Sequence, residues 1–293
     1  MYRFEMPRQV KSDYHGYQTF IDLANQTKEF VFEDIVIDFE QNTWFEANLC
    51  AVLGTIISNI SDLNSVELIN MNSWLENILS KNGFLVNFGG QLKIDFHQTT
   101  VKYQKYKVTE EKLIKKYLDE ELLQKNEFPK LSGLLRKKIG ESIFEIFSNA
   151  AIHGKCTHVY SCGQHYPNKT PARLDFTIVD LGRTIKKNVA DYLNSPIDGV
   201  DAIKWAVTEG HTTKQGSHPG GLGLKVIMEF LKINNGKMQI VSSDGYWELV
   251  RNEISFMSYV NSFPGTLINL EFNLDDKEAY YDIQEGLSID DIF

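Results

Sequence analysis

The chain has 293 residues, 42% of them hydrophobic and 24% charged, which is typical of a globular protein with one large domain or two smaller ones. The formal net charge of −9 argues against nucleic acid as the main partner, because phosphate binding needs a basic surface. No stretch approaches the roughly 18 apolar residues of a membrane span, residues 1–17 lack the apolar segment of a signal peptide, and three cysteines give no disulfide framework. We therefore expect a cytoplasmic protein with no membrane partner.

The first hundred residues alternate between strand and helix signals. Two short apolar runs, 35–39 (IVIDF) and 66–70 (VELIN), are typical of buried strands. A helix is predicted after each of them, over 47–60 and over 73–83, with Ser73 as N-cap and Gly83 as the stop of the second. This order predicts a small α/β layer with right-handed crossovers.

The composition changes between about 97 and 128, where Lys, Glu and Tyr dominate. This segment is either a linker followed by an exposed helix or the first helix of a second domain. We place the boundary near residue 100, which gives domains over 1–100 and 101–293.

The second half begins with a long predicted helix, 132–153, followed by a hairpin of strands 157–164 and 173–180 around a turn. A helical stretch, 199–210, then leads into a glycine-rich loop and a helix over 224–236. Three further strands are predicted: 237–243, 246–250 and 266–272. This order favours a mixed sheet covered by helices over a doubly wound parallel fold.

The helix 132–153 carries a polar stripe at four-residue intervals: Glu141, Glu145, Asn149 and His153. Steps of four residues keep these groups on one slanted face. The opposite face is apolar and should face the core: Ile139, Ile143, Phe147 and Ala150. A solvated surface would explain the stripe equally well. However, Asn149 lies in an apolar stretch, so we expect it to be half-buried and to need a partner.

A carboxylate ends the strand 173–180, where Asp180 is followed by a turn at Gly182. At the end of a buried strand, such a group can accept a hydrogen bond from an exocyclic amine, which adenine has and guanine lacks at that position. An ordinary strand-ending turn has the same composition.

The loop 211–223 places four glycines directly before a helix: Gly216, Gly220, Gly221 and Gly223. Glycine lets backbone N–H groups approach a phosphate, and the start of a helix adds partial positive charge. The loop is neither a P-loop nor a Rossmann motif. A flexible loop is the alternative.

A zinc site is a further candidate, from the cluster Cys156, His158, Cys162 and His165. However, side chains alternate between the two faces of a strand, so His165 points away from the other three. Ordinary strand side chains are the favoured interpretation.

The order of these motifs resembles the GHKL superfamily, the Bergerat-fold ATPases that include DNA gyrase and the histidine kinases. Residues 145–149 resemble its N box, 180–182 its first glycine box, 216–224 its second, and Gly265-Thr266 its final Gly-Thr element. The resemblance covers about residues 130–275. It implies a Bergerat α/β sandwich that binds ATP and Mg²⁺.

The resemblance also implies roles for individual residues. Glu145 would be the general base for water, Asn149 the Mg²⁺ ligand, and Asp180 the acceptor for the adenine amine, with Gly182 admitting the base. Residues 209–221 would form a mobile lid. The remaining nucleotide-binding residues would be Lys214, Gly216, Gly220, Gly221, Leu222, Gly223, Leu224 and Thr266.

Two departures from the family pattern matter. Thr184 stands where a second glycine is common in the first glycine box, and residues 105–140 contain no histidine to accept a phosphate. A sensor histidine kinase is therefore not expected.

Residues 1–100 resemble a STAS domain, the fold of anti-sigma-factor antagonists. Members that act as phosphoswitches carry a serine at a helix start, where this chain has Glu46-Ala47-Asn48-Leu49. We therefore expect a fixed docking domain that phosphorylation does not switch.

Three functions follow from the resemblance. The first is an ATPase that changes a contact with a regulatory protein partner, with a homodimer left open. The second is a Ser/Thr kinase of the anti-sigma-factor type. The third is an ATP-sensing module without catalysis. A general base at Glu145 favours the first.

Overall fold

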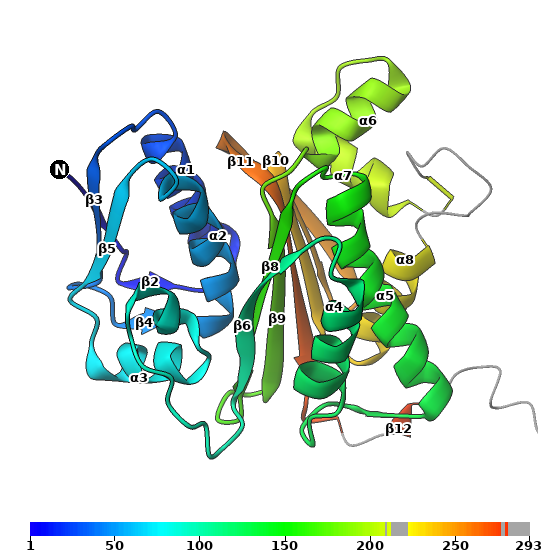
Figure 1. The fold of residues 1–293 in the computed structure, drawn as a ribbon. Helices are drawn as coiled ribbons and strands as arrows, with labels where there is room; N and C mark the ends of the chain where they lie inside the picture. The colour runs from blue at the N-terminus through cyan, green and yellow to red at the C-terminus, as the bar shows by residue number, and fades with distance from the viewer. Residues whose placement is uncertain (209, 212–221, 277–278, 281–293) are drawn as a thin grey trace, which may run out of the picture.

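The computed structural model describes residues 1–208, 210–211, 222–276 and 279–280, with side chains left undescribed at 222, 223 and 279. Two sheets and two groups of helices alternate in four layers (Figure 1). One sheet is parallel and the other antiparallel, so the predicted α/β class is confirmed. In the described part of the chain, no helix is both long and apolar enough to cross a membrane.

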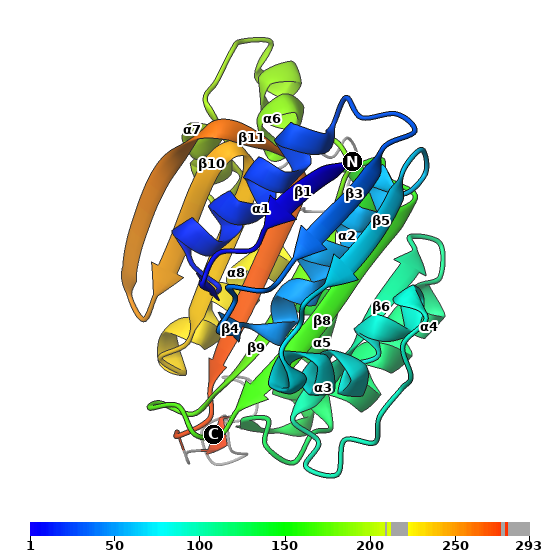
Figure 2. The same ribbon diagram turned by 90° about the vertical axis from the view of Figure 1, so that its left-hand side faces the viewer.

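The N-terminal sheet consists of three parallel strands, in the order β1 (Tyr2–Glu5), β3 (Asp34–Asp38) and β5 (Ser65–Ile69). The crossover helices are α1 (Tyr14–Thr27) and α2 (Cys50–Ile60), the latter preceded by the 3₁₀ turn η1 (Ala47–Leu49). Both helices lie on one face of this sheet, behind its strands in Figure 2. A short parallel pair completes this half: β2 (Gln9–Val10) and β4 (Trp44–Phe45). The predicted strands at 35–39 and 66–70 and the helix over 47–60 are confirmed within a few residues.

Helix α3 (Ser73–Lys81) follows β5, with Asn72 as its N-cap and Asn82 as its C-cap. The side chain of Asn72, not Ser73, accepts the hydrogen bond from the Leu75 N–H, so the predicted N-cap was wrong by one residue. Asparagine caps as well as serine does, and only the backbone geometry decides between adjacent candidates. Gly83 has φ of +84°, the left-handed conformation that ends a helix, before the 3₁₀ segment η2 (Phe84–Phe88).

The central sheet has five strands, in the order β10 (Lys237–Val250), β11 (Glu253–Asn273), β9 (Arg173–Asp180), β8 (His158–Tyr166) and β6 (Thr100–Lys107). All four strand pairs are antiparallel, whereas a mixed sheet was predicted. Three strands were predicted after residue 236, but the structure has two longer ones, β10 and β11. The prediction of a linker or helix from about residue 97 was wrong for residues 100–107, which form strand β6. The expected exposed helix follows this strand as α4 (Glu111–Tyr117).

Helices cover the far side of this sheet (Figure 1): α4, α5 (Gly133–Ile152), α7 (Gly199–Val207) and α8 (Leu222–Ile233). Shorter elements complete the half: the π-turn η3 (Leu118–Leu123), β7 (Lys130–Leu131) paired with β12 (Ala279–Tyr280), and α6 (Ile185–Leu193) at the top of the view. The apolar stripe predicted for α5 is buried: Ile139, Ile143, Phe147 and Ala150.

The two halves share one core. Helices α1 and α2 pack on the face of the central sheet opposite to α5, and Phe20 and Leu53 belong to the same buried cluster as Val179 and Leu267. The central sheet begins at Thr100, close to the predicted boundary. The division into two domains at residue 100 stays a prediction, because no gap in packing marks it.

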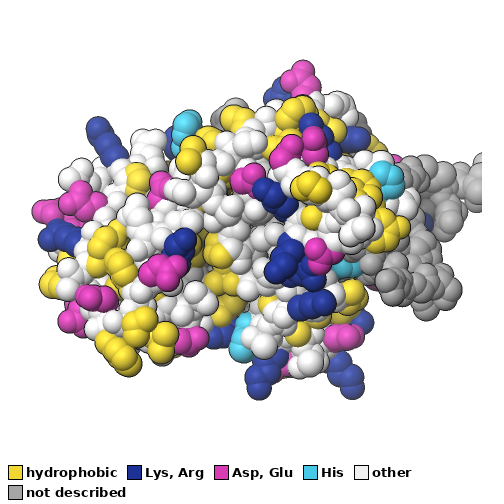
Figure 3. Space-filling view, turned by 90° about the horizontal axis from the view of Figure 1, so that it is seen from above, with side chains coloured by type: hydrophobic (Ala, Val, Ile, Leu, Met, Phe, Trp, Pro, Cys, Tyr) yellow, Lys and Arg dark blue, Asp and Glu magenta, His cyan; other side chains and the backbone are white. Residues whose placement is uncertain are grey.

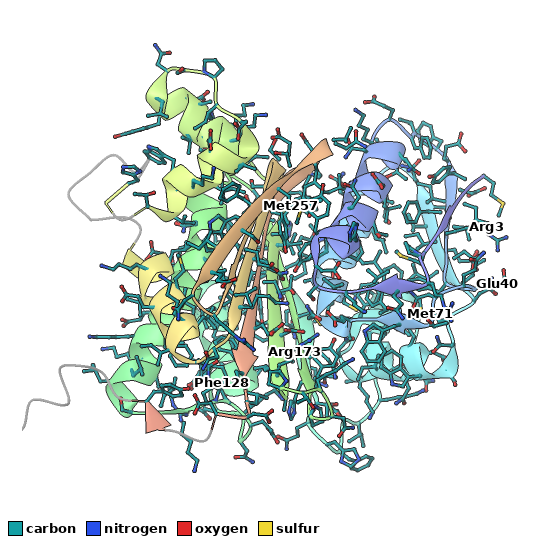
Figure 4. All side chains as sticks on the ribbon, turned by 180° about the vertical axis from the view of Figure 1, so that it is seen from behind. Arg3, Glu40, Met71, Phe128, Arg173 and Met257 are labelled. Atoms are coloured by element: carbon teal, nitrogen blue, oxygen red, sulfur yellow. The ribbon has the colours of Figure 1, made fainter. Side chains whose placement is uncertain are left out.

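A polar network lies inside this shared interface. Arg173, at the start of β9 and between the two sheets in Figure 4, contacts Glu46 at 2.5 Å and Asp175 at 3.1 Å. Glu46 also accepts the Ser12 N–H. Asn48 donates to the side chains of Ser12 and Thr177. All four residues of the segment 46–49 are therefore buried, and the side chains of Glu46 and Asn48 both have hydrogen-bond partners.

Candidate functional site

A cavity of about 130 Å³ opens between α5, the end of β9, the neighbouring part of β11 around Thr266, and the α6–α7 segment. A single ordered water needs only about 10–15 Å³ on the same measure, so the cavity has room for a larger ligand. Its floor is apolar, with the side chains of Ile146, Ile178, Ile240 and Ile268. Polar groups converge on it from three sides, the usual form of a small-molecule site.

The cavity brings together residues that are far apart in sequence and that were predicted as site residues: Glu145, Asn149, Asp180, Leu224 and Thr266. His153, the last member of the polar stripe, also lines it. Glu141 does not: its exposed carboxylate forms an ion pair with Lys137 at 4.0 Å on the outer surface of α5. The stripe therefore enters the cavity only from Glu145 onward.

Part of the predicted site lies outside the described residues. This holds for Lys214, Gly216, Gly220 and Gly221, and for all of the predicted lid 209–221 except Gly210 and His211. Leu222 and Gly223 begin helix α8, and only their backbone is described. Leu224, one residue later, reaches the cavity wall.

Asn149 has an amide oxygen that needs a ligand. The residue is half-buried, and its Oδ1 atom is buried with no hydrogen-bond partner among the described residues. A buried acceptor without a partner costs about 1–3 kcal/mol. Amide and carboxylate oxygens are the ligands that Mg²⁺ prefers, and Glu145 lies one helical turn away on the same wall. This pair of side chains fits a hydrated magnesium ion.

Asp180 is a buried carboxyl at the end of β9. Burial raises its pKa to about 7, and the hydrogen bond from the Gly182 N–H, at 2.8 Å, offsets only part of that effect. The group therefore changes charge close to neutral pH, whereas an exposed aspartate is ionised there. A raised pKa in a cavity is typical of functional carboxyls.

Close backbone contacts fix the position of Asp180. A side chain at Gly182 would lie 2.3 Å from the Gly154 carbonyl oxygen, and one at Gly265 would lie 1.9 Å from the Asp180 carbonyl oxygen. Both distances are far below van der Waals contact, so only glycine fits. Gly182 packs on Gly154 and orients Asp180, and it does not line the cavity. The role predicted for Gly182, admitting the base, stays a prediction.

Thr266 faces Asp180 across the β9–β11 ladder, where the two residues are direct partners. Its hydroxyl lies 3.0 Å from that of Ser242, which in turn accepts the Ile185 N–H. Thr184 caps α6, because its hydroxyl accepts the Lys187 N–H. The threonine therefore has a structural function at the start of this helix.

Sequence reasoning missed several cavity residues. Arg183 lines the cavity, forms an ion pair with Asp191, and has a buried Nε with no partner in the described chain. Trp205 contributes a flat ring and stacks on His211, with ring centroids 4.8 Å apart. The position of Arg183 directly after Gly182 could have identified it as a site residue. No signal in the sequence marked Trp205, because an aromatic residue on an amphipathic helix normally packs in the core.

The cysteine and histidine cluster does not form a site. Cys162 is buried against the Ala47 carbonyl, whereas the Cys156 thiol lies 3.2 Å from the Ala150 carbonyl at the end of α5. Among the described residues, no group of three or more metal-binding side chains comes together.

Searches against family models, curated proteins and solved structures found no match to this chain.

Proposed function

We propose that the chain is a Mg²⁺-dependent ATP-binding protein of the GHKL type, which hydrolyses ATP and thereby changes a contact with a regulatory protein. One observation carries the proposal. Residues chosen from three separate sequence motifs, Asn149, Asp180 and Thr266, line a single cavity. A chance resemblance in motif order would not be expected to bring all three side chains into one pocket.

The adenine base would lie over the apolar floor, beside Asp180. An ionised carboxylate accepts a hydrogen bond from the exocyclic amine of adenine but would face the carbonyl oxygen of guanine. The resulting pair of buried acceptors costs about 1–3 kcal/mol. The ring of Trp205 on the cavity wall supports a flat ligand, because aromatic faces stack favourably.

Asn149 and Glu145 would serve the phosphate end. The buried Oδ1 of Asn149 fits a magnesium ligand, and bound Mg²⁺ would neutralise phosphate charge. Glu145, one turn earlier on the same wall, would orient a water molecule and take its proton. The backbone N–H groups at the start of α8 point along the helix axis and suit an anion.

The predicted location, docking role and partners are parts of the same proposal. A cytoplasmic location is supported by the three free thiols, Cys50, Cys156 and Cys162. The STAS-like half would act as a fixed docking layer, and the homodimer stays open. The face seen in Figure 3 mixes acidic and basic side chains, which gives no support to nucleic acid as a partner.

Incubation of the purified full chain with γ-labelled ATP and Mg²⁺ tests the proposal. Release of free labelled phosphate is expected. Label on the protein would instead favour the Ser/Thr kinase, and binding without either product would favour the sensing module. The Asn149→Ala variant is the control, because it should abolish the signal in all three cases. Calorimetry that detects no Mg·ATP binding by the wild type would remove all three.

A further inference from the structure

A second hollow, the β5 groove, lies in the N-terminal half between strand β5 and the α3–η2 segment. It has a volume of about 580 Å³ and is open to solvent. Its lining is mixed: the apolar side chains are Val66, Leu68, Met71, Leu85 and Phe88, and the acidic ones are Glu67 and Glu76. Met71 lies in the N-terminal layer, well away from the proposed ATP site on the far side of the central sheet (Figure 4).

Strand β5 is an edge strand, and its outer backbone groups face this groove. The Ser65 N–H donates to the Glu33 carbonyl and the Ile69 carbonyl accepts the Phe39 N–H, so both residues face β3. Backbone groups alternate in direction along a strand, and Val66 and Leu68 therefore direct their N–H and C=O groups outward. No described residue hydrogen-bonds to these four groups on the groove side.

Native proteins protect such edges, usually with lysine or proline. The edge strand of the central sheet follows this rule: β6 carries Lys102, Lys105 and Lys107. Strand β5 has neither residue type, and its only charge is Glu67. An unprotected edge beside pockets for alternate side chains is typical of a site where a peptide adds as a strand.

A second copy of this chain fits the edge poorly. An antiparallel twofold pairing that satisfies all outward groups sets Val66 opposite Leu68 and Glu67 opposite Glu67. Like charges directly opposite each other destabilise a strand pair. The net charge of −9 adds further repulsion between copies. The acidic members Glu67 and Glu76 instead complement a basic partner.

We propose that the β5 groove binds an extended segment of another protein, which adds as a strand beside β5 and carries Lys or Arg residues that face Glu67 and Glu76. The backbone of the segment pairs with Val66 and Leu68. Its alternate apolar side chains cover Leu85 and Phe88. This proposal is independent of ATP binding, since no residue of the groove lines the other cavity.

Selection from a phage-displayed library of random peptides on the immobilised full chain tests this site. The enriched peptides should alternate apolar residues with Lys or Arg. A synthetic peptide of the consensus sequence should slow amide hydrogen exchange at Val66 and Leu68. The double variant Glu67→Lys/Glu76→Lys should bind it at least tenfold more weakly. The variant Glu29→Lys/Glu40→Lys has the same change in net charge at exposed positions outside the groove, and should bind normally.

Several outcomes would overturn the proposal. One is the absence of enriched peptides, and another is enrichment of acidic ones. Equal affinity of the two double variants, or exchange protection elsewhere with none at Val66 and Leu68, would also do so. A wild-type dimer in which amide exchange at Val66 and Leu68 is slow without added peptide would assign the groove to a second copy instead.

Discussion

The charge of Asp180 should control base selectivity and make it depend on pH. Burial sets the pKa of this carboxyl to about 7 in the ligand-free protein. The ionised form accepts from the amine of adenine, whereas the neutral form can donate to the carbonyl oxygen of guanine. Preference for ATP over GTP should therefore be largest above pH 8 and should shrink as the pH falls below 7.

The size of the pH effect on ATP affinity follows from the pKa of Asp180. At pH 6, the neutral carboxyl outnumbers the ionised one about tenfold, so ATP should bind about tenfold more weakly than at high pH from this cause alone. The phosphates of both nucleotides titrate alike, and the ratio of the two dissociation constants cancels that contribution. Competition calorimetry between pH 6 and 8.5 measures the ratio. The Asp180→Asn variant is the control, since it cannot titrate.

The same pKa predicts that the folded chain loses stability as the pH rises, whereas its affinity for ATP increases. An unfolded aspartate has a pKa of about 3.9. Between pH 4 and 7, the folded chain therefore holds a proton that the unfolded chain has released. The contribution of Asp180 to the free energy of unfolding is complete below pH 4 and is lost as the pH rises to 7, about 4 kcal/mol in total. Urea titrations should show that Asp180→Asn flattens this slope. A selectivity ratio independent of pH, together with an unchanged stability slope in the variant, would refute the assignment of Asp180.

Three further predictions rest on single side chains. Glu145→Ala should keep ATP affinity and lose about 10²–10⁴-fold in phosphate release, whereas Asn149→Ala should lose Mg·ATP binding and turnover together. The matched control on the same helix is exposed Glu141, and Glu141→Ala should change the free energy of unfolding by no more than about 0.5 kcal/mol. Hydrolysis at the wild-type rate by Glu145→Ala would remove the assignment of Glu145 as the base. Mass spectrometry of the native protein should find no phosphate on residues 46–49, because this segment has no hydroxyl and Asn48 is buried. Phosphate on the exposed Thr43 would contradict the expectation that phosphorylation does not switch this half. Arg173→Ala should lower the free energy of unfolding, measured by urea titration, by about 3–5 kcal/mol, because it leaves buried Glu46 without the guanidinium that it contacts, and a change below about 1 kcal/mol would contradict that role.

The elements with strong periodicity could be predicted from the sequence. Strand β9 and helix α5 were located within one or two residues, because each has a clear apolar pattern and a turn or cap at its ends. Strand β6 was missed for a physical reason. An edge strand pairs on one side only and carries lysines against aggregation, so its composition is that of a linker. Helix α6 was missed because it is short and Val189 is its one fully buried residue.

The site was predicted where the chemistry itself restricts the residue type. An amide in an apolar helix and a carboxyl at a buried strand end both conflict with their local surroundings, and both line the cavity. Trp205 conflicts with nothing locally, so only the tertiary arrangement reveals it. The internal network around Arg173 was not predicted either, because its contact to Glu46 joins residues that are far apart in the chain.

The proposed ATP site and the N-terminal layer use opposite faces of the same two strands. On neighbouring rungs of the β9–β11 ladder, Ile178 pairs with Ile268 on the cavity floor, and Thr177 pairs with Asn269 on the other face. Asn48 donates to Thr177 from the N-terminal layer. Consecutive residues of a strand point to opposite faces, so the buried polar network lies one rung away from the cavity floor on the same two strands.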